Sequence, residues 1–236
     1  MLAKPLSADA SAFSSNKLIR LIMNLRNKGI SDTDVLSAME RTPRDIFIPE
    51  RMRDQAYEDM AIPIGRGQTI SQPYVVAMMT QALDVNDRHK VLEIGTGSGY
   101  KAAILARLCR RLYTIERHKP LLDRAQHMFD KLHLRNITSI CADGMNGWPI
   151  INGMSQAPFQ RIIVTAAARG KPPQALLDQL DVGGIMVCPV GESTDDQVLK
   201  RYEKLSEDTY SISEICPVRF VPLLPDVARQ NENADD

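Results

Sequence analysis

The sequence is poor in the residues that bind metal ions or form disulfides. Its 236 residues include four histidines and four cysteines. The cysteines stand singly, without the close pairs that zinc sites and redox dithiols use, and the histidines show no ligand spacing. Cys141 and Cys188 fall in apolar runs, where a small buried thiol is the usual interpretation. We therefore expect no metal site.

An excess of charge of one sign and long apolar runs are also missing. Lys plus Arg and Asp plus Glu number 29 each, so no global field attracts nucleic acid or an anionic membrane. No apolar stretch approaches the roughly 20 residues of a bilayer span, and the first residues lack a secretory apolar region. No heptad seam is evident. We expect a cytoplasmic monomer without nucleic-acid or membrane partners.

Length and patterning indicate one domain with extensions. With 44% apolar residues, the chain can bury one substantial core but is short for two. We expect a single domain over residues 1–224, made of an N-terminal helical cap (1–60) and a core with a substrate loop (61–224). A polar tail (225–236) is expected to be mobile. Within the cap, Ser31 and Asp34 resemble a capping box at a helix start.

From residue 90 onward, strand-like and helix-like segments alternate, which predicts a mostly parallel α/β sheet of the Rossmann-like type. The runs VLEI (91–94) and RIIV (161–164) are almost continuously apolar, as in strands buried on both faces. The segments 196–205, 210–218 and 218–224 have no helices between them. We therefore expect the sheet to end in antiparallel strands.

A glycine-rich turn follows the first of these strands and indicates a nucleotide-binding loop. It consists of Gly95, Thr96, Gly97, Ser98 and Gly99. Glycines let a ligand approach the backbone closely, and an acidic residue at the end of the next strand is suited to a ribose. That residue is Glu116. The alternative interpretation is a tight turn without a ligand.

The acidic side chains distinguish between possible cofactors. Glu93 is expected beside the loop, where its charge would repel a pyrophosphate and attract the cationic amino-acid part of S-adenosylmethionine. The turn also has the spacing GxGxG, whereas dinucleotide-binding folds favour GxGxxG. Asp143 and Gly144 end the third strand, where a carboxylate could contact adenine. These features predict S-adenosylmethionine as the cofactor.

A polar segment upstream, Gly67 to Tyr74, leads into a helix expected to begin near Pro73. In the simplest interpretation Ser71 or Gln72 caps that helix, which contributes about 1 kcal/mol of stability and no chemistry. The periodicity alone does not decide between capping and catalysis.

These motifs together resemble the protein-L-isoaspartate O-methyltransferases. The likeness covers most of residues 40 to 224. The segments that carry it are 44–50 (RDIFIPE), 56–59 (AYED), 62–65 (IPIG), 67–74 (GQTISQPY), 92–100 (LEIGTGSGY), 143–144 (DG), 147–149 (GWP), 163–168 (IVTAAA), 183–184 (GG), 189–191 (PVG) and 218–223 (VRFVPL). The glycine loop is common to many methyltransferases, whereas the segments around Ser71 and Arg219 are more specific to this family.

The resemblance implies a Rossmann-like methyltransferase with an added N-terminal helical part. It places Ser71 on the active-site serine of the family, in contact with both substrate and cofactor, with Thr69 and Ile70 beside the cofactor. The implied reaction esterifies the free carboxylate of L-isoaspartyl residues in damaged proteins and releases S-adenosylhomocysteine. The methyl ester then closes to a succinimide, which hydrolyses partly to normal aspartate.

The residue types suit this reaction. A carboxylate with a pKa near 4 is already ionised at neutral pH, so methyl transfer to it needs no general base, and none is evident. The substrate is an isomerised backbone, which edge-like pairing with an extended peptide would recognise. We expect Ile62, Pro63 and Ile64, together with Arg219 and Val221, to line such a groove, although plain packing is equally compatible with the sequence.

Three other functions are compatible with a glycine loop of this kind. A small-molecule carboxyl or hydroxyl O-methyltransferase could use the same scaffold, although the segment 69–73 (TISQP) argues against it. A nucleic-acid methyltransferase is disfavoured because 165–168 (TAAA) replaces the Asn-Pro-Pro-Tyr type of run and no basic excess exists. A cofactor-sensing module would keep the loop but not Ser71.

Overall fold

The computed structural model describes residues 8–229. The helices are α1 (Ala8–Asn27), α2 (Thr33–Glu40), α3 (Pro73–Leu83), α4 (Tyr100–Ala106), α5 (Lys119–Lys131) and α6 (Gln174–Asp178), with short 3-10 helices η1 (Arg44–Phe47), η2 (Glu50–Gln55) and η3 (Gly144–Asn146). The strands are β1 (Ile62–Gly65), β2 (Gln68–Ile70), β3 (Lys90–Ile94), β4 (Arg111–Glu116), β5 (Ile137–Cys141), β6 (Phe159–Val164), β7 (Ala168–Arg169), β8 (Leu180–Gly191), β9 (Val198–Ser206) and β10 (Thr209–Pro217).

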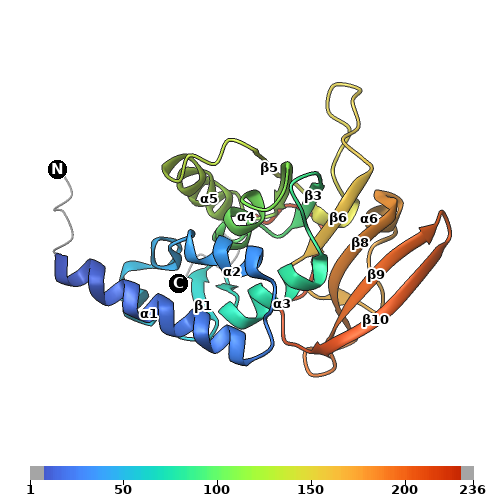
Figure 1. Ribbon diagram of the computed structural model, residues 1–236. Helices are drawn as coiled ribbons and strands as arrows, with labels where there is room; N and C mark the ends of the chain where they lie inside the picture. The colour runs from blue at the N-terminus through green and yellow to red at the C-terminus, as the bar shows by residue number, and fades with distance from the viewer. Residues whose placement is uncertain (1–7, 230–236) are drawn as a thin grey trace.

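The main sheet has the strand order β10-β9-β8-β6-β3-β4-β5, with the short β7 paired to β8. Strands β8, β6, β3, β4 and β5 are parallel, and β9 and β10 join antiparallel at one edge. Figure 1 shows the β9–β10 hairpin at the opposite end of the molecule from α1. The predicted Rossmann-like sheet with antiparallel C-terminal strands is confirmed.

Both faces of the central strands are buried, as their apolar sequences predict. Val91 of β3 and Ile163 of β6 pack on one face with α3, α4 and α5. Their neighbours along the strands, Leu92 and Ile162, pack on the other face with α6 and Trp148. Successive side chains of a strand point to opposite faces, so each strand joins two apolar layers. This rigid sheet fixes the carboxyl ends of β3, β4 and β6.

The N-terminal helices form a separate layer against α3 and α4. Leu25 of α1, Leu36 of α2 and Ile62 of β1 belong to one buried cluster with residues of those two helices. The capping prediction is wrong by one residue: Asp32 is the N-cap of α2 and accepts hydrogen bonds from the amides of Asp34 and Val35. The Ser31 amide instead donates to the side-chain oxygen of Gln81, which ties the start of α2 to α3.

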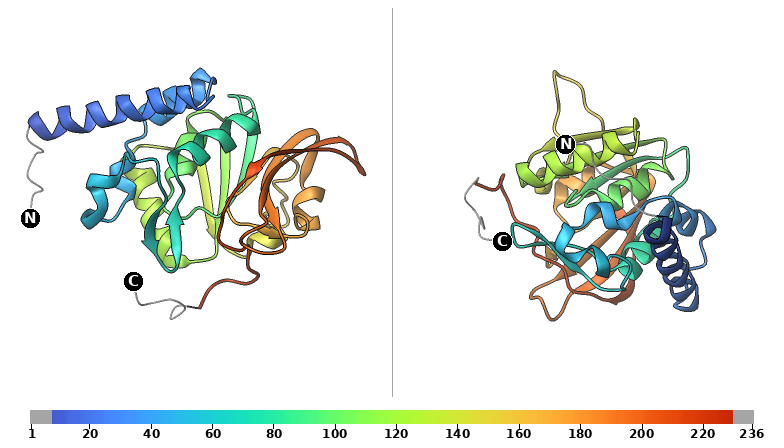
Figure 2. Two further views of the ribbon diagram at one scale, coloured as in Figure 1. Left: turned by 90° about the horizontal axis from the view of Figure 1, so that it is seen from below. Right: turned by 90° about the vertical axis from the view of Figure 1, so that its left-hand side faces the viewer.

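The segment 218–224 is not the antiparallel strand that we expected. It forms one isolated bridge, in which Pro222 lies beside Ala167, and otherwise crosses the carboxyl end of the sheet. Figure 2 shows the chain leaving β10 and running back toward the N-terminal half. The Arg117 carbonyl accepts a hydrogen bond from the Ala228 amide, and the Arg117 side chain donates to the carbonyls of Pro225 and Asp226. The rest of the predicted tail, from residue 230, lies outside the described residues.

In the described part of the chain, no helix is long and apolar enough to cross a membrane. The same residues contain no group of three or more His, Cys, Asp or Glu side chains that could hold a metal ion.

Candidate active site

A pocket of about 820 Å³ opens at the carboxyl ends of β3, β4 and β6. Three parts of the chain surround it: the segment around β2, the glycine loop with the end of β4, and the segment after β10. The predicted site residues that line it are Thr69, Ile70, Ser71, Gly95, Thr96, Gly97, Ser98, Glu116, Gly144, Arg219 and Val221. The fold therefore brings together most of a site predicted from segments far apart in sequence.

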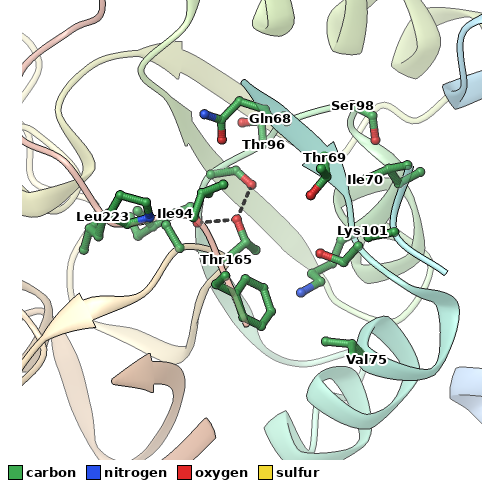
Figure 3. A pocket seen from close by; sticks show the side chains of 18 of the residues that line it. Gln68, Thr69, Ile70, Val75, Ile94, Thr96, Ser98, Lys101, Thr165 and Leu223 are labelled. Carbon is green, nitrogen blue, oxygen red and sulfur yellow. Dashed lines mark hydrogen bonds between the residues drawn. The ribbon is translucent and has the colours of Figure 1, made fainter. Parts of the chain in front are cut away.

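The glycine loop has a backbone that few other residues adopt. Gly95, Gly97 and Gly99 have φ angles of 94°, 55° and 86°, in the left-handed region where a Cβ is disfavoured. At Gly95 a Cβ would also lie 2.2 Å from Thr165 Oγ1. That hydroxyl donates toward the carbonyls of Ile94 and Gly95, at 2.9 and 2.8 Å (Figure 3). The end of β6 thus holds the start of the loop in place.

Glu116 ends β4 and holds the middle of the loop. One carboxylate oxygen accepts from the Gly97 amide at 2.8 Å, and the other accepts from the His118 amide at 2.9 Å. Burial raises the pKa of Glu116, while these amide donors act in the opposite direction. A carboxylate that lines the pocket beside a glycine loop is suited to accept hydrogen bonds from the hydroxyls of a ribose.

Glu93 lies behind the loop and does not line the pocket. Its side chain is fully buried, and Thr114 donates to one of its oxygens at 2.7 Å. The single proton of the Thr114 hydroxyl is donated to Glu93. The Thr96 hydroxyl, whose oxygen lies 2.7 Å from that of Thr114, is therefore the donor in the Thr96–Thr114 hydrogen bond. Burial raises the pKa of Glu93. The geometry connects Glu93 to the loop through Thr96, and a direct contact with a cofactor stays a prediction.

Ser71 lies in the pocket between β2 and α3. Gln72 is the N-cap of α3 and makes no side-chain capping bond. Instead, Asp59 accepts a hydrogen bond from the amide of Tyr74, in the first turn of α3, at 2.8 Å. Asp59 thus supplies the capping that the simplest interpretation gave to Ser71 or Gln72. Within residues 8–229 the half-buried Ser71 hydroxyl makes no hydrogen bond, so it is available to a ligand.

The segment after β10 forms another wall of the pocket that Ser71 lines. Buried Gln197 holds it, since the side chain of Gln197 accepts from the Phe220 amide at 2.6 Å and donates to the Phe220 carbonyl at 3.1 Å. Ala167 pairs with the same segment on the other side, through the carbonyl of Val221 and the amide of Leu223, each at 2.8 Å. Arg219 is exposed at the rim.

Several predicted site residues lie outside this pocket. Ile62 is fully buried in the helical layer, Pro63 is exposed, and Ile64 lines a second cavity of about 430 Å³. Asp143 accepts from the Met145 amide and caps η3. At Gly99 an added Cβ would lie 2.8 Å from a ring carbon of Phe129, so this glycine permits close packing of α4 on α5. Ligand contacts by these residues remain predictions.

The sequence did not single out three residues that shape the pocket: Lys101, Thr165 and Gln197. Lys101 offered one signal, because it interrupts the otherwise apolar helix YKAAILA. Thr165 belongs to the motif 163–168 but shows no signal of its own, and Gln197 lies in a polar stretch that gives no sign of its burial.

The fold and this pocket define the class: a Rossmann-like methyltransferase, with its glycine loop and acidic residue at the carboxyl ends of β3 and β4. The family model described as protein-L-isoaspartate(D-aspartate) O-methyltransferase (PCMT) matches residues 16–228. The chain therefore belongs to this family.

Similar proteins that are described as members of this family support the assignment. A protein-L-isoaspartate O-methyltransferase from Rhodospirillum centenum is 54% identical over 92% of this chain and 96% of its own length. One from Paramagnetospirillum magneticum is 56% identical over 91% of this chain and 97% of its own. The resemblance inferred from the motifs is confirmed.

Two solved structures share the fold. A Plasmodium falciparum protein described as a protein-L-isoaspartate O-methyltransferase, in complex with S-adenosyl-L-homocysteine, matches with a TM-score of 0.74 and 24% identity over 90% of this chain and 98% of its own. Another protein-L-isoaspartate O-methyltransferase matches with a TM-score of 0.78 and 24% identity over 89% of this chain and 67% of its own. At these identities the likeness supports the fold alone.

Proposed function

We propose that this chain transfers the methyl group of S-adenosylmethionine to the free carboxylate of L-isoaspartyl residues in proteins and peptides. The observation that carries the proposal is a single pocket shared by the glycine loop, Glu116, Ser71 and the wall 218–223. Donor and acceptor can meet there with Ser71 between them. The family membership supports the same substrate.

The residues present fit the cofactor. The backbone of Gly95 and Gly97 is open toward the pocket, and the Glu116 carboxylate lies beside the Gly97 amide. Glu116 would hold the ribose, and the glycine loop and Gly144 would contact the other parts of the cofactor. When bound, S-adenosylmethionine supplies an electrophilic methyl group, and a carboxylate oxygen bonds to it as the carbon–sulfur bond breaks and its electron pair stays on sulfur.

Ser71 positions the acceptor. Its hydroxyl is free to donate to a carboxylate oxygen of the acceptor. No proton is removed from an ionised carboxylate, so no general base is required. The apolar side chains of Phe220 and Val221 line the same pocket and exclude water from the reacting oxygen, which strengthens each polar contact.

The wall 218–223 is suited to an extended peptide. Its backbone already pairs with Ala167 on one side, and Val221 and Arg219 lie along the pocket rim. Ile62, Pro63 and Ile64 contribute to the groove by forming β1, which pairs with β2 just before Ser71. A Val221→Arg variant tests this arrangement, because unaltered affinity for the peptide would remove Val221 from the groove.

We also propose that the protein acts as a cytoplasmic monomer without a nucleic-acid partner. Its four cysteines are free, as is usual in a reducing compartment, and its charges balance at 29 of each sign. Light scattering coupled to size-exclusion chromatography tests the oligomeric state.

The main experiment compares two peptides that differ only in one linkage, L-isoaspartate or L-aspartate, with methyl-labelled S-adenosylmethionine. We expect base-labile label in the isoaspartyl peptide alone. Ser71→Ala is expected to lower kcat/KM about 10- to 100-fold, as for loss of a hydrogen bond to a charged group. Ser211→Ala, at an exposed site on β10, is the matched control and should have no effect.

Label in neither peptide would refute the proposal and direct the search toward small-molecule carboxylates or alcohols. Equal label in both peptides would refute recognition of the isomerised backbone.

A further inference from the structure

Lys101 is a buried lysine that projects into the pocket. It lies in the first turn of α4, and only 6% of its surface is exposed. In Figure 3 its nitrogen points into the pocket on the side of Val75 and Thr165. Charged lysine side chains are almost never buried to this degree unless they are paired.

The partners of this ammonium group are incomplete. Its hydrogen bond goes to the sulfur of Met79 at 3.0 Å, a weak acceptor, whereas an ammonium group has three donors. No carboxylate among residues 8–229 forms a salt bridge with it. Burial lowers the pKa of Lys101, and the charge of the more distant Glu93 acts in the opposite direction. The side chain therefore has unused donors aimed at the space where ligands bind.

A second buried lysine shows what a structural role looks like in this fold. Lys204 on β9 is also almost fully buried, but its nitrogen donates to the carbonyls of Leu180 at 2.9 Å and Leu177 at 3.4 Å. It also pairs with Glu207 at 3.5 Å. Lys204 is satisfied within the protein, whereas Lys101 has only a thioether.

We propose that Lys101 is a ligand-binding residue whose ammonium group receives a carboxylate in the filled pocket. A carboxylate is the anion expected there, because the proposed function, on which this inference rests, brings two of them to the end of the pocket near Ser71. One is the amino-acid carboxylate of the cofactor, and the other is the acceptor. Lys101 lies between the glycine loop and α3, so its ammonium group can bind either of these two carboxylates.

Binding and kinetic measurements on Lys101→Met separate these sources. Methionine keeps the length of the side chain and removes the charge. The probes are S-adenosylhomocysteine, which has the amino-acid carboxylate, and 5′-methylthioadenosine, which lacks it. Kd is measured for both by calorimetry, and KM and kcat are measured for the isoaspartyl peptide. Lys204→Met is the matched control.

We expect one of two results. If Lys101 binds the cofactor carboxylate, Kd for S-adenosylhomocysteine rises at least about tenfold, while Kd for 5′-methylthioadenosine changes less than about twofold. If it binds the acceptor, both Kd values are unchanged and the peptide KM rises at least about tenfold, with kcat within about twofold. Both Kd values and KM within about twofold of wild type would overturn the inference.

Thermal unfolding without ligand provides a further test. Lys101→Met should leave the melting temperature unchanged or raise it, because it removes a poorly paired buried charge. Lys204→Met should lower it and leave ligand binding intact. If Lys101→Met instead fails to fold, Lys101 is structural and the inference is wrong. Should the wild type leave the isoaspartyl peptide unmethylated, the proposed function fails, while the two Kd values still test Lys101.

Discussion

Replacing Glu116 with glutamine should weaken cofactor binding by an amount that the structure allows us to predict. The two oxygens of Glu116 each accept one backbone amide, from Gly97 at 2.8 Å and from His118 at 2.9 Å. Glutamine has one acceptor oxygen, so its amide group must face one of these donors. A hydrogen bond to a charged group contributes about 1.5–3 kcal/mol. Part of this lost free energy destabilises the glycine loop itself. The neutral glutamine side chain is also a weaker hydrogen-bond acceptor for the ribose hydroxyls than the glutamate carboxylate is.

We therefore expect Kd for S-adenosylhomocysteine to rise about 10- to 100-fold in Glu116→Gln, or about 1.4–2.8 kcal/mol. Calorimetry at 25 °C is the assay. Glu214→Gln is the matched control, because Glu214 is an exposed carboxylate on β10 paired with Lys200 and undergoes the same chemical change. Its Kd should stay within about twofold of wild type.

A second ligand tests the physical reason. Because Glu116 is expected to act at the ribose, 5′-methylthioadenosine should lose as much affinity in Glu116→Gln as S-adenosylhomocysteine does. A folded Glu116→Gln protein that binds S-adenosylhomocysteine within about threefold of wild type would refute the reasoning. A loss confined to S-adenosylhomocysteine would place Glu116 at the amino-acid end instead.

Three further outcomes are expected. Gly95→Ala should abolish detectable cofactor binding, since its Cβ would lie 2.2 Å from Thr165 Oγ1 at a φ of 94°; normal affinity by calorimetry would contradict this geometry. Burial raises the pKa values of Cys109 and Cys188 to about 12, so iodoacetamide at pH 8 should leave both unmodified in the folded protein, as peptide mass mapping can verify. Burial also raises the pKa of Glu93 above its ordinary value, so the folded state holds this proton more tightly and the stability that Glu93 contributes falls as pH rises above about 4.5. The unfolding free energy of wild type minus that of Glu93→Gln should therefore fall by more than about 1 kcal/mol between pH 5 and pH 8. Urea titrations of both proteins at the two pH values measure this difference. The same difference at both pH values would argue against a buried carboxyl group that keeps its proton.

The sequence predicted the parts of the site that local patterns determine. Apolar strands that end in a glycine turn or an acidic residue predict the positions of Gly95 and Glu116, because parallel strands bring their carboxyl ends to one edge. The same patterns could not distinguish a strand from the wall 218–224, since alternating apolar residues suit a pocket lining as well as a sheet. The one-residue error at Ser31 arose because neighbouring polar residues can each cap a helix locally. In the fold the amides of both Ser31 and Asp32 donate to Gln81 of α3, a contact with a distant helix that no local pattern predicts.

The burial of Lys101 could not be predicted for a related reason. A lysine on a short helix is normally solvated, and its exclusion from water here depends on Met79 of α3, a helix that precedes it in the chain and packs against it only in the folded protein. Sequence periodicity describes one element at a time. A site built where several elements meet requires their relative placement.

Three features that are costly for folding lie in this pocket or directly behind its glycine loop. The loop has three glycines at positive φ, one oxygen of buried Glu93 has no hydrogen-bond partner within the described residues, and Lys101 has only a thioether. Each lowers the stability of the protein without ligand. Local rules are violated chiefly at functional sites, and of these groups the Lys101 ammonium lines the pocket, where a ligand can satisfy it. A ligand that binds only the folded state stabilises it by mass action, so binding at this pocket can offset what these residues cost.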